Sequence, residues 1–206
     1  MTGVIFDLDG TLLDTLEDLK DAVNYSLGQF GYPLRSLEEI RRFVGNGAKF
    51  LIQLAVPEGA DPEPVYGTFR KYYQQNCQVK TAPYPGILEM LADLDMPVAI
   101  VSNKPDSAVK ALCADYFPGI YALGDSPDCP RKPAPDMVFK AMQDMGVERC
   151  IYVGDSEVDV ATARNAGVPC LSVTWGFRNQ KELLEAGATR FCNTPGDIPR
   201  LIQALT

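Results

Sequence analysis

Two aspartates, Asp7 and Asp9, follow the short apolar run Val4–Phe6 near the N-terminus. Like charges at this spacing repel each other, and removal from water raises the free energy of ionising each carboxyl group. A positive charge must therefore lie close to the pair. Mg²⁺ suits such a site because it prefers carboxylates, carbonyl oxygens and retained water molecules as ligands.

Polar residues also follow two later apolar runs, Val98–Val101 and Ile151–Val153. They are Ser102, Asn103 and Lys104 after the first run, and Asp155, Ser156 and Asp159 after the second. In an open parallel sheet, ligands bind beyond the carboxyl ends of the strands, so these residues can meet Asp7 and Asp9 in one site. Taken singly, Asp155, Asp159 and Ser102 also fit roles at the start of a helix.

Together these residues favour phosphoryl transfer. An aspartate can attack phosphorus and form an aspartyl-phosphate, while a second carboxyl group transfers protons. A metal ion, a hydroxyl group and a lysine such as Lys132 can stabilise charge on the phosphoryl oxygens, although Lys132 alone also fits an exposed loop lysine. The 206-residue chain contains no histidine, which excludes a Ser-His-Asp triad, a Cys-His dyad and a His-ligated metal.

The composition of the chain argues against several classes of function and location. A net charge of -8 with scattered Lys and Arg argues against nucleic-acid binding. No apolar run has transmembrane length, and Met1-Thr2-Gly3 lacks the basic start of a signal peptide, so we expect a cytoplasmic protein that does not bind membranes. The six cysteines form no CxxC pair and predict buried free thiols. Composition does not predict the oligomeric state.

Strand and helix patterns alternate along most of the chain. The predicted strands are Val4–Phe6, Val98–Val101, Ile151–Val153 and Leu171–Val173, and the predicted helices are about Gly86–Leu94, Asp106–Tyr116, Pro135–Met145 and Val158–Ala166. This alternation predicts an α/β fold with a doubly wound parallel sheet and a Rossmann-like core. Residues 195–206 predict a closing helix.

Residues 15–82 interrupt the alternation. Leu16, Leu19, Val23 and Leu27 recur at helical spacing, and no convincing strand is present. We therefore predict a catalytic core at residues 1–14 and 83–206, with an inserted α-helical domain at residues 15–82.

Four motifs resemble those of the haloacid dehalogenase superfamily, in its phosphatase branch. They are "DLDGT" at 7–11, "VSN" at 101–103, "KPAP" at 132–135 and "GDSEVD" at 154–159, and they occur in the family's order over nearly the whole chain. The resemblance implies that the helical insert is a cap domain. It also implies hydrolysis of a small phosphorylated metabolite through an aspartyl-phosphate on Asp7.

The same resemblance implies individual roles. Asp9 would protonate the leaving alcohol and then activate water, while Ser102, Asn103 and Lys132 would bind the phosphoryl group. Mg²⁺ would be held by Asp7, the main-chain carbonyl of Asp9 and Asp155, with Asp159 supporting or ligating it. Gly10 would permit a sharp turn after the strand, and Thr11 would fix the phosphate-binding loop.

Within the cap, "FVGNGAKFLI" at 43–52 resembles the segment that phosphoglycolate phosphatases present to the active site, and "VSNKP" and "TWGF" add to this likeness. The resemblance implies substrate contacts by Gly45, Asn46, Gly47 and Lys49. On the residues alone, an ordinary turn between helices and an exposed lysine fit equally well.

Several alternatives stay open at this point. A sugar-phosphate mutase, a pyrophosphatase or a nucleotidase of the same superfamily would share the four motifs. A phospho-Asp receiver module, which binds partners and hydrolyses no substrate, is an alternative of another class, although the long insert argues against it. A haloalkanoate dehalogenase would lack Asp9.

Overall fold

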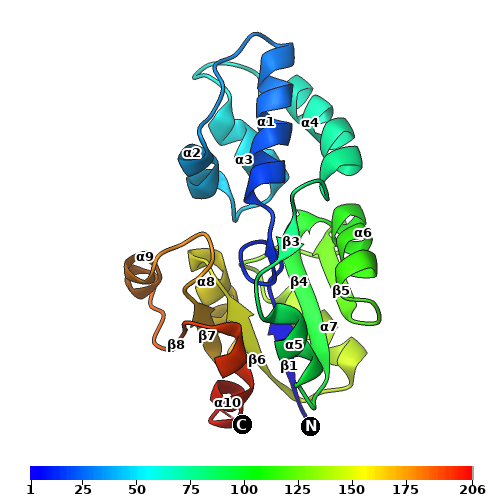
Figure 1. The fold of residues 1–206 in the computed structure, drawn as a ribbon, viewed down its shortest axis with the longest axis vertical. Helices are drawn as coiled ribbons and strands as arrows, with labels where there is room; N and C mark the ends of the chain where they lie inside the picture. The colour runs from blue at the N-terminus through cyan, green and yellow to red at the C-terminus, as the bar shows by residue number, and fades with distance from the viewer. Residues whose placement is uncertain (206) are drawn as a thin grey trace.

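A six-stranded parallel sheet forms the centre of the protein, as a computed structural model that describes residues 1–205 shows (Figure 1). The strand order is β5-β4-β1-β6-β7-β8. The strands are β1 Thr2–Phe6, β4 Val98–Pro105, β5 Tyr121–Asp125, β6 Arg149–Gly154, β7 Cys170–Val173 and β8 Phe191–Cys192. The predicted α/β fold with a parallel sheet is confirmed.

Helices cover both faces of this sheet, and the alternation of side chains along β1 shows how. Val4 and Phe6 face one hydrophobic cluster, which includes residues of α5, α6 and α10. Ile5 faces the opposite cluster, which includes residues of α7 and α8. Because both faces are buried, the strand is apolar at every position from 4 to 6. The helices of this part are α5 Ile87–Ala92, α6 Asp106–Tyr116, α7 Asp136–Met145, α8 Glu157–Ala166, α9 Gln180–Glu185 and α10 Ile198–Gln203.

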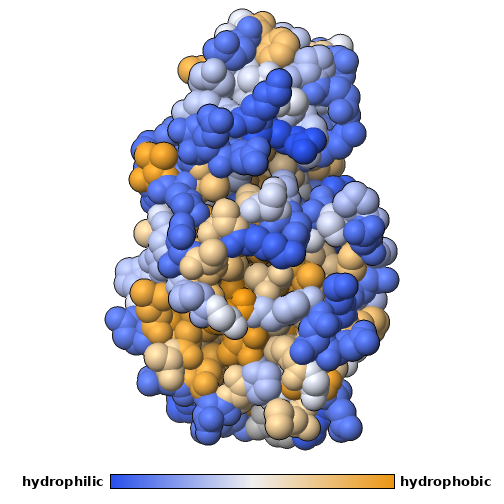
Figure 2. Space-filling model, turned by 90° about the vertical axis from the view of Figure 1, so that its right-hand side faces the viewer, coloured by the Kyte–Doolittle hydropathy of each residue, from blue (hydrophilic) through white to orange (hydrophobic). Residues whose placement is uncertain are grey.

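Four further helices form a unit with its own hydrophobic core at the carboxyl ends of the strands (Figure 1). They are α1 Leu16–Gln29, α2 Leu37–Phe43, α3 Ala48–Ala55 and α4 Pro62–Asn76, and we call residues 16–76 the helical unit. The chain enters and leaves it through an antiparallel pair of short strands, β2 Leu13–Asp14 and β3 Ala82–Pro83. On the face shown in Figure 2, the helical unit is mostly hydrophilic, while hydrophobic surface gathers over the sheet-containing part. The domain boundaries at 15 and 82 stay a prediction.

The structure differs from the predicted elements in three places. Strands β2, β3, β5 and β8 and helix α9 were not predicted; β2, β3 and β8 have only two residues each, and β5 alternates buried with half-buried side chains. Strand β4 runs on to Pro105, with an irregular register after Val101, so Ser102 to Lys104 lie inside the strand and not beyond it. The closing helix ends at Gln203, and Thr206 lies outside the described residues.

All six cysteines are free thiols, and four of them are buried, while Cys129 and Cys170 are half-buried. Burial raises the pKa of the Cys113 and Cys170 thiols to about 12, so both stay protonated at neutral pH. Within residues 1–205, no helix is both long and apolar enough to cross a bilayer.

Candidate active site

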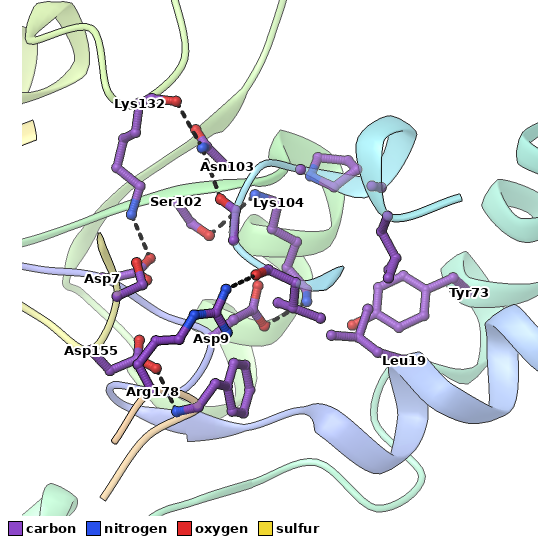
Figure 3. Close-up of a pocket in the computed structure, with 18 of the residues that line it drawn as sticks. Asp7, Asp9, Leu19, Tyr73, Ser102, Asn103, Lys104, Lys132, Asp155 and Arg178 are labelled. Carbon is purple, nitrogen blue, oxygen red and sulfur yellow. Dashed lines mark hydrogen bonds and ion pairs between the residues drawn. The ribbon is translucent and has the colours of Figure 1, made fainter. Parts of the chain in front are cut away.

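A cavity of about 50 Å³ lies where the carboxyl ends of β1, β4 and β6 face the helical unit (Figure 3). This volume exceeds what one water molecule needs. The sheet side of the wall contributes mainly polar side chains: Asp7, Asp9, Ser102, Asn103, Lys104, Lys132, Asp155 and Ser156. The structure thus brings residues of all four motifs to one place.

Asp7 and Lys132 form a buried ion pair at the base of the cavity, with 2.8 Å between Asp7 Oδ1 and Lys132 Nζ. Burial and the nearby Asp159 carboxylate raise the pKa of Asp7 well above its ordinary value, although Lys132 opposes the shift. Burial disfavours charge on Lys132 too, but Asp159 and Asp7 outweigh it and raise the pKa of the ammonium group. Lys132 therefore remains positively charged beside Asp7.

Asp159 is fully buried, and both of its carboxylate oxygens are engaged. Oδ1 accepts hydrogen bonds from Lys132 Nζ at 2.8 Å and from the Tyr152 hydroxyl at 3.0 Å. Oδ2 accepts from the backbone N–H and the hydroxyl of Ser156, which completes a capping box at the start of α8. In this arrangement Asp159 orients Lys132 and caps the first turn of helix α8.

Asp155 is held by groups from two other segments. Its Oδ1 accepts a hydrogen bond from the Thr11 hydroxyl at 3.1 Å, and its Oδ2 accepts from the backbone N–H of Phe177 at 2.6 Å. Burial and the Asp159 carboxylate raise the pKa of Asp155 to about 7. A cation at this point would offset the repulsion that produces the shift.

Gly10 makes the close approach of the first loop to Asp155 possible. Its φ of +84° lies in the left-handed region, and a Cβ atom there would lie 2.4 Å from Asp155 Oδ2. The sharp turn expected at Gly10 therefore also leaves room for the carboxylate.

We expect Gly10→Ala to lower both stability and activity. Strain at positive φ costs about 1 kcal/mol or more, and the clash must also displace Asp155. Gly59→Ala is a matched control because Gly59 has φ +78°, but no atom of residues 1–205 outside its own neighbours lies within 4 Å of an added Cβ. Thermal unfolding and phosphatase assays of both variants measure the difference. Equal losses in the two variants would contradict a role for Gly10 in placing Asp155.

Asp9 lies on the cavity wall and is fixed through one oxygen. Its Oδ1 accepts hydrogen bonds from the Thr15 hydroxyl at 2.6 Å and from Lys104 Nζ at 2.7 Å. Thr15 is the residue before helix α1, but its side chain does not cap that helix. The first motif is thereby linked to the start of the helical unit.

Ser102 and Asn103 are buried in β4, beside the cavity. The Ser102 hydroxyl oxygen accepts from the backbone N–H of Lys104, which leaves its own proton available to donate. The Asn103 amide donates to the carbonyl oxygens of Gly45 and Lys132 at 3.1 and 2.9 Å. Asn103 therefore ties the helical unit to the loop that carries Lys132, and its contact with phosphate stays a prediction.

The buried carboxylates fit a divalent cation. One oxygen from each of Asp7, Asp155 and Asp159 lies within 4.8 Å of the others. The donor set consists of oxygen atoms alone, as Mg²⁺ prefers, and the pKa values of Asp7 and Asp155 are raised by burial and mutual repulsion. Asp9 is not in this group, and the resemblance assigned it only a main-chain carbonyl ligand.

The predicted cap residues divide between the cavity and the surface. Gly45 and Gly47 line the cavity, and a Cβ atom on Gly47 would lie 3.2 Å from the Asn103 carbonyl oxygen. Asn46 is not among the lining residues, nor is Lys49, whose exposed side chain pairs with Glu63. Substrate contacts by these four residues stay a prediction.

Arg178, in the loop after β7, joins the two parts of the protein. Its guanidinium group donates to the carbonyl oxygens of Arg41 and Val44 at 2.7 Å each, at the C-terminal end of α2, and its Nε donates to Glu157. A cation at a helix C-terminus is favourable because it meets the negative end of the helix dipole.

Sequence reasoning placed Lys104 near the site without giving it a role, and it did not single out Tyr73 or Arg178, which also line the cavity. Lys104 follows the "VSN" motif and Arg178 follows "TWGF", so both had a signal in their position next to a motif. Tyr73 had none, because its contribution depends on how α4 packs over the sheet.

Comparison with known proteins adds independent information. Residues 4–173 match the family model of haloacid dehalogenase-like hydrolases. Phosphoglycolate phosphatase of Rhodobacter capsulatus is 38% identical over 190 residues, which are 85% of each protein. A solved structure from Lactobacillus delbrueckii subsp. bulgaricus, of a protein assigned as a phosphoglycolate phosphatase, is similar with a TM-score of 0.92 and 37% identity over 97% of both chains. A haloacid dehalogenase-like family hydrolase from Streptococcus pneumoniae has a TM-score of 0.89 at 26% identity, over 98% of this chain and 99% of that one.

Proposed function

The chain belongs to the haloacid dehalogenase-like hydrolase family and is a phosphatase, and from this premise we propose that it hydrolyses 2-phosphoglycolate with Mg²⁺ through an aspartyl-phosphate. The observation that carries the proposal is the buried Asp7–Lys132 pair beside Asp9 and Asp155 in one cavity. The substrate is proposed from the similarity to phosphoglycolate phosphatases.

In the proposed reaction, Asp7 attacks the phosphorus atom. Lys132 holds one oxygen of Asp7 at 2.8 Å, which leaves the other oxygen of the carboxylate for attack. The P–O bond to the leaving alcohol breaks as the Asp7 oxygen forms its bond to phosphorus, and Lys132 and the Ser102 hydroxyl stabilise charge on the phosphoryl oxygens. Asp7, Asp155 and the main-chain carbonyl of Asp9 would hold Mg²⁺, which would neutralise phosphoryl charge.

Asp9 supplies the proton transfers in this proposal. Thr15 and Lys104 both bind Oδ1, so the second carboxyl oxygen is the one free to carry a proton to the leaving alcohol. The same oxygen then takes a proton from the water that hydrolyses the aspartyl-phosphate. Hydrolysis returns Asp7 as a carboxylate and releases phosphate.

Steady-state assays test the proposed function. We expect Mg²⁺-dependent release of phosphate from 2-phosphoglycolate, with a higher kcat/KM than for glucose 6-phosphate, inorganic pyrophosphate or nucleoside monophosphates. A higher value for one of these would replace the proposed substrate and leave the phosphatase assignment in place. Turnover of p-nitrophenyl phosphate separates any of these enzymes from a receiver module.

A further inference from the structure

Three buried cations line the cavity: Lys104, Lys132 and Arg178. Lys132 binds Asp7, Asp159 and the hydroxyl of Tyr152. Arg178 is engaged with Glu157 and with main-chain carbonyls at the end of α2. Of the three, Lys104 is the one with an N–H donor left for a ligand, as its contacts show.

The Lys104 ammonium group donates a hydrogen bond to Asp9 Oδ1, lies beside the Tyr73 hydroxyl oxygen, and is 4.8 Å from the centre of the Tyr73 ring. An ammonium group carries three N–H donors. The side chain is only 2% exposed, and the residue lines the cavity. Burial opposes its charge, but Asp9 and Tyr73 outweigh burial and raise its pKa, so that Lys104 stays charged.

Tyr73, on helix α4, offers a second unfilled donor at the same place. Its hydroxyl is buried beside Lys104, which can only donate to its oxygen, so within residues 1–205 the O–H proton itself has no acceptor, and the residue lines the cavity (Figure 3). Its ring stacks on Phe69 with 5.2 Å between the centres, which fixes its position. Burial raises the pKa of Tyr73, so its hydroxyl keeps a proton to donate at neutral pH. A buried polar group without a partner costs free energy until a ligand satisfies it.

The position of Asp9 determines how far the ester oxygen of a bound substrate would lie from Lys104 and Tyr73. For proton transfer, the Asp9 carboxyl must lie about 2.6–3.2 Å from the ester oxygen of the substrate. Lys104 Nζ lies 2.7 Å from Asp9 Oδ1. A carboxylate attached one carbon beyond the ester oxygen has its own oxygens roughly 3 Å from that oxygen, given standard bond lengths. Such a group can therefore accept from Lys104 while Asp9 contacts the ester oxygen.

We propose that Lys104 and Tyr73 form the site for a carboxylate on the leaving group of the substrate, and so select phosphomonoesters with an acid group one carbon from the ester oxygen. The inference rests on the proposed function and deepens it, because it names the residues that would bind the carboxylate of the substrate, which does not react. The substrate carboxylate would then bind to Lys104 of the sheet and Tyr73 of the helical unit, and not to the exposed Lys49.

The test compares 2-phosphoglycolate with ethyl phosphate, in which a methyl group replaces the carboxylate. We expect Lys104→Met to lower kcat/KM for 2-phosphoglycolate on the order of 100-fold more than for ethyl phosphate, because a buried charge-assisted contact is lost only for the first. Tyr73→Phe keeps the ring and should produce a smaller loss in the same direction. Lys110→Met, which removes an exposed lysine of α6, is the control and should change neither value.

Binding measurements separate this site from the proposed activity. In an Asp7→Asn background, calorimetry should show that Lys104→Met weakens binding of 2-phosphoglycolate and has little effect on ethyl phosphate. Equal losses for the two ligands, in turnover or in binding, would mean that Lys104 acts only through Asp9 and would overturn the inference. Should the wild-type enzyme hydrolyse neither ester, the proposed function fails, and the calorimetry still decides the carboxylate site.

Discussion

Asp7→Asn is expected to lower kcat by roughly 10⁴-fold or more, since an amide is a poor nucleophile and a weaker metal ligand than a carboxylate. The structure adds a second reason. Lys132 pairs with Asp7 at 2.8 Å in a buried position, and the substitution removes half of the anionic environment that holds this lysine. Single-turnover and steady-state assays measure the loss, and circular dichroism checks that the variant folds. Activity at a substantial fraction of the wild-type rate would rule out a covalent mechanism on Asp7.

Asp9→Asn provides the comparison, because it keeps the main-chain carbonyl and removes only the proton-transfer group. We expect a loss of about 10²–10⁴-fold, the range typical of general acid–base catalysis. With an activated aryl phosphate, whose leaving group needs no proton, the first step should be affected less than hydrolysis of the intermediate. Phosphorylated protein should then accumulate in Asp9→Asn and be detected by mass spectrometry.

Removal of divalent cations should abolish turnover, with a loss of about 10³-fold or more, since a metal ion supplies several kcal/mol of charge stabilisation. We expect Mg²⁺ to restore activity after chelation and Ca²⁺ to inhibit, because Ca²⁺ binds carboxylates at longer distances and can engage both oxygens of Asp7. Full activity in a chelator would contradict any metal requirement.

A readout independent of turnover is thermal stability. Mg²⁺ should raise the Tm of the wild-type protein, because a ligand that binds only the folded state stabilises it by about 2.7 kcal/mol at 100 times its Kd. The rise should be smaller in Asp155→Asn, which removes one of the three clustered carboxylates. Asp93→Asn, which removes an exposed carboxylate after α5, should respond like the wild type. Identical responses in all three proteins would place the cation elsewhere.

The central strands of the sheet could be predicted from the local sequence pattern. The central strands are apolar without interruption because both of their faces are covered, so β1, β4, β6 and β7 could be recognised. The rule that ligands bind at the carboxyl ends of parallel strands then placed Asp7, Ser102 and Asp155 together. Strand β8 carries no such pattern, because two residues are too few for a period to show.

The roles of Lys104 and Tyr73 could not be predicted in the same way. Lys104 lies in the part of β4 that continues past Val101 with an irregular register, where it is buried and pairs with Asp9. Tyr73 reads as one more core aromatic of a helix until α4 is placed over the sheet. Both depend on contacts between segments that are far apart in sequence.

The bonds from Arg178 to the end of α2 bear on how firmly the helical unit is held against the rest of the protein. Any motion that separates α2 from the loop after β7 exchanges the bonds to Arg41 and Val44 for bonds to water. Each such exchange is worth about 0.5–1.5 kcal/mol, so two of them favour the closed arrangement by about 1–3 kcal/mol. Arg178 thereby adds to the free energy that holds the helical unit against the loop after β7, in addition to the bond that Asn103 makes to the Gly45 carbonyl oxygen.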